Sequence, residues 1–100
     1  MKKIELHPEV ENDLTQASEY YQHNRNGYGV RFLENYVKSI NVIRQFPEIG
    51  TFYIADILCT RIREFPYSIF YLNLEKSIFI LAVIHDRRRP GFWMNRMNDL

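Results

Sequence analysis

The spacing of the apolar residues changes after Pro47, and this change restricts the folds that the sequence can adopt. From Val10 to Phe46, apolar side chains recur every three or four residues, which predicts amphipathic helices. From Ile57 onward they alternate or form short continuous runs, which predicts strands. A chain in which helices precede a run of strands belongs to the α+β class.

The first half predicts one strand and two helices. Residues 2–7 alternate and indicate a short strand, after which Pro8 suits the first turn of a helix, where its missing N–H costs nothing. This helix ends near His23, and its apolar stripe comprises Val10, Leu14, Ala17 and Tyr21. After a turn at residues 24–27, a second helix covers residues 28–46. Its expected buried stripe comprises Leu33, Tyr36, Val37, Ile40 and Ile43.

The second half predicts three strands, at residues 57–65, 67–74 and 77–85. Their short connections require antiparallel neighbours. The last strand is apolar on both faces, so we expect it to be central, with the helices on one side and another layer on the other. Residues 92–100 indicate a short terminal helix. The order is β-α-α-β-β-β: one domain over residues 1–100, with a helix hairpin on one face of a four-stranded, mainly antiparallel sheet.

Charge and cysteine content narrow the classes of function. The formal net charge is only +1, but residues 85–96 hold four arginines against one aspartate. Such a local basic patch indicates a local anionic or acidic contact. The single cysteine, Cys59, allows no internal disulfide, and neither a signal peptide nor a membrane span is recognisable, so we expect a cytoplasmic protein. The sequence has no metal-ligand spacing and no phosphate loop, so we expect no metal and no cofactor.

Four sequence patterns resemble the RelE/ParE toxin superfamily, and specifically ParE-like toxins of the plasmid stabilisation type. They are residues 6–14 (LHPEVENDL), 46–50 (FPEIG), 61–63 (RIR) with 67–71 (YSIFY), and 80–90 (ILAVIHDRRRP) with Trp93 and Arg96. The resemblance implies the toxin of a type II toxin–antitoxin system that inhibits DNA gyrase and is neutralised by a cognate antitoxin in a hetero-oligomer. The resemblance also leaves open a RelE-like ribosome-dependent mRNA endonuclease, and a degenerate, non-toxic interaction module is a further alternative.

Three arginines and one histidine are the candidates for chemistry. Arg61 and Arg63 are two residues apart on an expected strand, so both would point to one face and bind phosphates or partner carboxylates; the alternative is a solvated strand face. His85 could serve as a general acid or base, or simply bond to the backbone at a strand end. If the protein is a ribonuclease, the catalytic candidates are His85, Arg61, Arg63 and Arg87; a ParE-like toxin implies no catalysis. The segment that follows the last strand has no tyrosine to serve as the acid.

The segment after His85 is the main candidate for binding a target or antitoxin. Its arginines are Arg87, Arg88, Arg89 and Arg96. Pro90 and Trp93 flank the run of three and are expected to fix it, with Trp93 packed at the sheet edge. Arg96 is expected to pair with Asp99 or Asp86. Arg61, Arg63 and Trp93 complete the predicted binding set.

Overall fold

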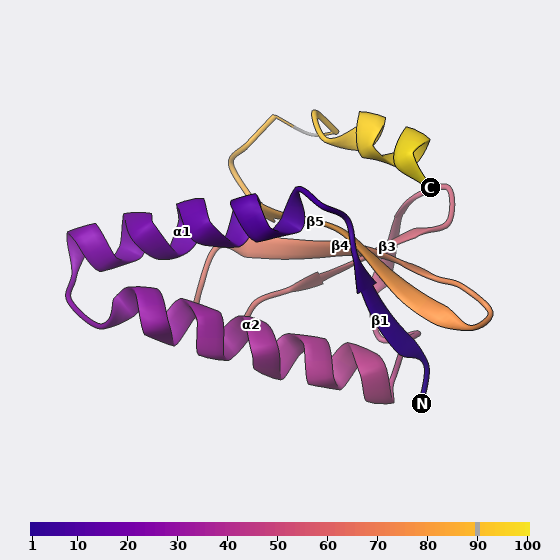
Figure 1. The fold of residues 1–100 in the computed structure, drawn as a ribbon, viewed down its shortest axis with the longest axis horizontal. Helices are drawn as coiled ribbons and strands as arrows, with labels where there is room; N and C mark the ends of the chain where they lie inside the picture. Colours follow the sequence, from indigo (N-terminus) through magenta and orange to yellow (C-terminus); the bar gives the residue numbers. More distant parts are fainter. Residues whose placement is uncertain (90) are drawn as a thin grey trace.

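The computed structural model describes residues 1–89 and 91–100 and contains five strands, two α-helices and a 3-10 helix. Their order is β1 (Lys3–Leu6), α1 (Val10–Asn24), α2 (Tyr28–Gln45), β2 (Thr51–Ile54), β3 (Ile57–Arg61), β4 (Tyr67–Asn73), β5 (Ser77–His85) and η1 (Met94–Asp99). Figure 1 shows the helix hairpin and the C-terminal segment on different sides of the sheet. No helix of the described residues is both long and apolar enough to cross a membrane.

The sheet has one strand more than predicted. Its order is β1-β5-β4-β3-β2, with β1 parallel to β5 and the other pairs antiparallel. The additional strand, β2, forms an edge, and all four of its residues are exposed, so it has no buried-and-exposed alternation to reveal it. The Tyr71 hydroxyl positions the loop before β2, because it donates to the Pro47 carbonyl (2.8 Å) and accepts from the Gly50 N–H (3.0 Å).

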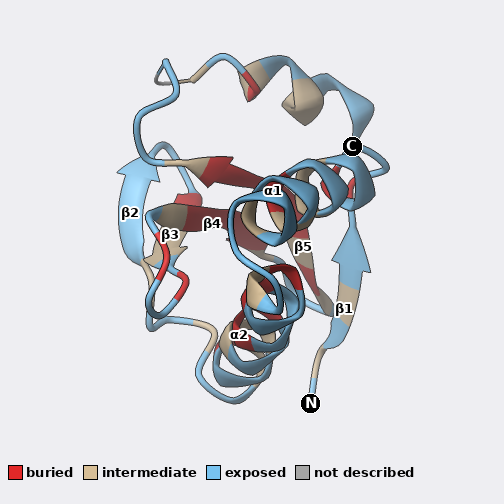
Figure 2. Cartoon of the chain, turned by 90° about the vertical axis from the view of Figure 1, so that its left-hand side faces the viewer, coloured by how far each residue is buried: buried red, intermediate tan, exposed pale blue. Residues whose placement is uncertain are grey.

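The strand β5 is an interior strand that is covered on both faces, as predicted (Figure 2). Its register against β4 shifts where Phe70 faces Ala82 and Tyr71 faces Ile80, which makes Leu81 an extra, bulged residue. Ile80 therefore packs toward the helices, whereas Leu81 and Ala82 both pack toward the C-terminal segment. The bulge shifts by one residue the alternation of β5 side chains between the two faces of the sheet. Because both faces are covered by other elements, the side chains on each face are apolar.

The helix hairpin covers one face of the sheet, but α2 is rotated relative to the predicted stripe. Leu33 and Val37, predicted to be buried, are 38% and 53% exposed. Phe32 is fully buried instead, in an aromatic cluster with Tyr21 and Phe65. The stripe prediction is wrong at these two positions because the large Phe32 ring fills the space over the sheet. The rest of this layer comprises Val10, Ala17, Tyr36, Ile43, Leu58, Ile62, Ile69, Tyr71, Ile78, Ile80 and Val83.

The pKa of a buried phenol on α2 gives a first testable prediction. Burial raises the pKa of Tyr36 to about 12, against about 10 in an unfolded chain. Below pH 10 both states are protonated and the stabilisation is complete. Between pH 10 and 12 only the unfolded chain loses the proton, so the free energy of unfolding should fall by about 1 kcal/mol per pH unit from this group. Urea unfolding at pH 9, 10 and 11 measures this fall. Tyr36→Phe should make the measured fall smaller by this amount, because the raised pKa values of Tyr21, Tyr67 and Tyr71 still contribute. An identical slope in the variant would contradict the assignment.

Candidate functional site

The part of β5 that follows Ile80 has no neighbouring strand on the β1 side, and two side chains bond to its backbone there instead. The pairing of β1 with β5 stops at Leu6 and Ile80, followed by one bond from the His7 N–H to the Ile80 carbonyl (2.9 Å). Past this point, the Arg96 guanidinium donates to the Leu81 carbonyl (3.1 Å). The Val83 N–H donates to the Asp13 carboxylate (3.1 Å). Both backbone groups at the bulge are therefore satisfied by side chains.

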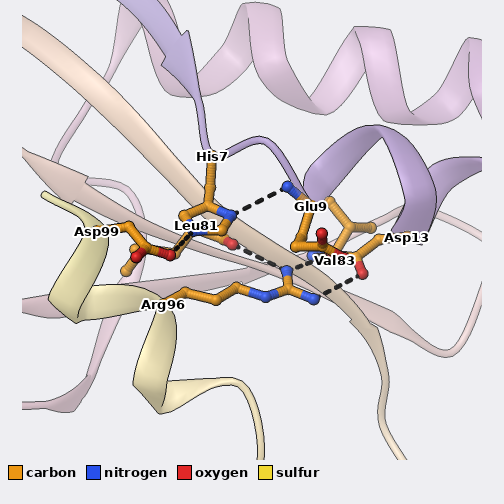
Figure 3. A network of polar contacts seen from close by, with 7 residues as sticks. All are labelled: His7, Glu9, Asp13, Leu81, Val83, Arg96 and Asp99. Carbon is orange, nitrogen blue, oxygen red and sulfur yellow. Dashed lines mark hydrogen bonds and ion pairs between the residues drawn. The ribbon is translucent and has the colours of Figure 1, made fainter.

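Asp13 and Arg96 also bind each other through two parallel bonds (Figure 3). The guanidinium nitrogens lie 2.7 and 2.9 Å from the two carboxylate oxygens. The side chains of Asp13 and Arg96 are only 9% and 11% exposed, so this is a nearly buried, bidentate ion pair. The prediction that Arg96 pairs with Asp99 or Asp86 is wrong. Arg96 instead fixes η1 to the first turns of α1 and to β5.

A buried histidine makes a second connection to η1. His7 is 3% exposed, and its Nδ1 accepts a hydrogen bond from the Glu9 N–H (3.0 Å). Because Nδ1 accepts a hydrogen bond, the ring proton is on Nε2. The Nε2–H donates a hydrogen bond to the Asp99 carboxylate, 2.7 Å away (Figure 3). The only signal for this contact in the sequence is the place of His7 directly before a helix. We call these two contacts, Asp13–Arg96 and His7–Asp99, the tail clasp.

Arg61 and Arg63 do not share a strand face, so that prediction is wrong. The strand β3 ends at Arg61, and Arg63 lies in the following turn. The Arg61 guanidinium is 2.7 Å from the Asp86 carboxylate, which also accepts from the Ser68 hydroxyl (2.8 Å). Arg63 lines a recess beside α2. The Arg61 guanidinium is therefore engaged by Asp86, although both arginines line the recess beside α2.

His85 bonds to the backbone, as the alternative interpretation predicted. Its Nδ1 accepts from the Arg87 N–H (3.0 Å), and its ring meets the Tyr67 ring edge-on at 5.1 Å. Both residues line a recess of about 400 Å³ between α1 and the C-terminal segment, together with Arg88. Burial raises the pKa of the Tyr67 phenol, which makes it a weaker proton donor near neutral pH.

The basic run, Arg87 to Arg89, follows β5 and lies at the surface, next to the packed C-terminal tail (residues 91–100). Arg87, Arg88 and Arg89 are all exposed, and the Arg88 guanidinium lies 4.2 Å above the Phe92 ring. The predicted role of Pro90 falls outside the described residues. Trp93 is 2% exposed, which confirms its packing role. It covers the sheet face rather than an edge, because its ring lies 4.5 Å from that of Phe70 on the interior strand β4.

The fold and these contacts define a small α+β protein whose helix hairpin and C-terminal segment cover opposite faces of one sheet. A solved structure described as the chromosomal ParDE TA system from P. aeruginosa shares the fold, with a TM-score of 0.75 and 15% identity. The alignment covers 85% of this chain and 96% of that one. Residues 4–90 match the family described as ParE toxin of type II toxin-antitoxin system, parDE. The chain belongs to this family, as its sequence patterns predicted. No curated protein matches the sequence.

Proposed function

We propose that this protein inhibits DNA gyrase and that a cognate antitoxin neutralises it. Membership of the ParE toxin family supports this proposal. The observation that carries it is the exposed run Arg87, Arg88 and Arg89, which directly precedes a tail anchored by Trp93 and the tail clasp. A cationic segment on a fixed support is suited to an acidic protein surface or to DNA held by an enzyme.

A supercoiling assay with purified gyrase and relaxed plasmid tests the proposal. The toxin should inhibit supercoiling, and Arg87→Gln with Arg89→Gln should raise the toxin concentration needed for half-inhibition about tenfold, since two cationic contacts of about 0.7 kcal/mol each are removed. Lys76→Gln, which removes a cation from the distant β4–β5 turn, is the matched control and should inhibit normally. Gyrase that remains fully active at a large excess of toxin would reject the proposal.

The ribonuclease alternative receives less support from the geometry. The Arg61 guanidinium is engaged by Asp86, Arg63 lines a recess beside α2, and the Nδ1 of His85 already accepts the Arg87 N–H. Toeprinting on a translated message tests it directly. Cleavage that is abolished by His85→Ala would favour a ribosome-dependent nuclease over gyrase inhibition.

We also propose that the antitoxin contributes an acidic, extended or helical segment that lies against the arginines and the apolar surface of the toxin. The growth assay separates this proposal from a degenerate, non-toxic module. Expression of the chain alone should arrest growth, and coexpression of the neighbouring gene should restore it. Normal growth with the toxin alone, at confirmed expression, would favour the degenerate module.

A further inference from the structure

The strand β1 forms an open edge of the sheet. Among the described residues it pairs with β5 and with no other strand, and three of its four residues are exposed (Figure 2). An open edge presents unpaired N–H and C=O groups, so it can accept a further strand. The opposite edge, β2, is less suited to this, because its register shifts between Phe52 and Ile54 and interrupts the row of backbone groups.

The bonds between β1 and β5 determine which backbone groups of β1 point outward. The His7 N–H donates to the Ile80 carbonyl (2.9 Å), so the backbone groups of His7 face β5. Successive residues of a strand point their N–H and C=O groups to opposite sides. Those of Glu5 therefore also face β5, whereas those of Ile4 and Leu6 point away from the sheet. These outward groups are the ones that an added strand would meet.

The side chains of β1 alternate between the two faces of the sheet. Ile4 packs against the layer under the helix hairpin. Lys3 and Glu5, on either side of it, therefore project to the other face. Both are exposed, and among the described residues neither forms an ion pair. A strand with lysine and glutamate two positions apart on one face is complementary in charge to an antiparallel copy of itself.

One antiparallel register satisfies both the backbone groups and the charges. Outward-pointing residues must lie opposite outward-pointing residues. Registers that overlap most of β1 therefore place Lys3, Ile4 or Glu5 opposite its own copy. A centre at Lys3 brings two ammonium groups together, and a centre at Glu5 brings two carboxylates together, so both are unfavourable. A centre at Ile4 joins the two Ile4 backbones by reciprocal hydrogen bonds and sets Lys3 of each copy opposite Glu5 of the other.

We propose that two copies of this chain associate through β1 in this register, which joins their sheets into one about a twofold axis at Ile4. Leu6, which is 47% exposed, then lies opposite Lys2 of the second copy. The Lys2 ammonium donates to the Asn73 side chain and to the Leu74 carbonyl (both 2.7 Å), so its methylene stem is held in place to cover Leu6. The inference is independent of gyrase inhibition, because the basic run takes no part in the contact.

Sedimentation velocity of the purified toxin over a wide range of concentration tests the association. The toxin should pass from monomer to dimer as its concentration rises. Lys3→Glu and Glu5→Lys should each raise the dissociation constant of the dimer at least about tenfold, because two attractive cross-strand pairs become repulsive. An equimolar mixture of the two variants should dimerise about as tightly as the unmodified toxin, since both pairs then have opposite charges. Glu19→Lys makes the same charge change at an exposed position of α1 and should dimerise normally.

Hydrogen exchange of the unmodified toxin gives a second readout, which does not depend on the folding of any variant. The amides of Ile4 and Leu6 should exchange slowly where the dimer predominates and quickly after dilution. Those of Glu5 and His7 face β5 and should stay protected at both concentrations. A toxin that is monomeric at every concentration, or Ile4 and Leu6 amides that do not respond to dilution, would overturn the inference. So would a dimer that survives both charge reversals, or a mixture of the folded variants that stays monomeric.

Discussion

Replacement of Arg96 with leucine is expected to lower the free energy of unfolding by about 3–5 kcal/mol, the loss that follows when one partner of a buried ion pair is removed. The Asp13 side chain, 9% exposed beside Arg96, would keep the Val83 N–H as its remaining donor among the described residues. The Leu81 carbonyl at the β5 bulge would lose the Arg96 donor as well. Urea unfolding at pH 7, followed by circular dichroism, measures the change.

Two further variants show whether the ion pair itself is responsible. Arg89→Leu removes an exposed arginine and should change the free energy of unfolding by less than about 0.5 kcal/mol. The double variant Asp13→Leu with Arg96→Leu should be more stable than the sum of the single effects predicts, by about 1–3 kcal/mol, because no charge is then left buried alone. Recovery should be incomplete, since Leu81 and Val83 still lose their side-chain partners. Additive single effects would show that the two residues act independently.

Local patterns predicted those parts of the fold that depend on neighbouring residues. The helix hairpin and the β3-β4-β5 meander follow from apolar spacing and turn chemistry, and the burial of β5 on both faces follows from its continuous apolar run. The exposed strand β2 carries no such pattern. The end of β3 was also missed, because a turn containing Glu64 at φ 74° interrupts the extended chain after Arg61. Left-handed backbone at a glutamate is not foreseeable from its residue type.

The contacts of the candidate site depend on residues far apart in the chain, which sequence spacing cannot bring together. Asp13 and Arg96 are separated by 83 positions, and His7 and Asp99 by 92. Asp13 lies in the first turn of α1, where an acidic residue is common, and Arg96 lies in a basic segment, so each has a sufficient local explanation. Asp13 and Arg96 meet because β5 has no neighbouring strand beside its bulge, so that both side chains bond to its free backbone groups.

Replacement of Trp93 with alanine should have an effect of similar size by a different route. The indole is 2% exposed and contacts Phe70 at 4.5 Å and Tyr53 at 6.0 Å between ring centroids. Its loss should cost about 3–5 kcal/mol, as is usual for a buried aromatic that leaves a cavity. Phe92→Ala is the matched control, because Phe92 is 38% exposed and should cost less than about 1.5 kcal/mol. Equal effects of the two substitutions in urea unfolding would contradict the packing assigned to Trp93.

Hydrogen exchange on Trp93→Ala separates loss of the tail from loss of the whole fold. The tail clasp acts on one side of η1 through Arg96 and Asp99, whereas Trp93 covers the sheet face. If the clasp is sufficient, amides near Leu81 and Val83 should stay protected while those of η1 exchange faster only by local fraying. If η1 detaches, protection at the β5 bulge should fall together with that of η1. In that case a folded Trp93→Ala toxin should also lose gyrase inhibition, since the arginine run before the tail would no longer have a fixed support. A folded variant with a detached tail and undiminished inhibition would show that the position of this run is unimportant.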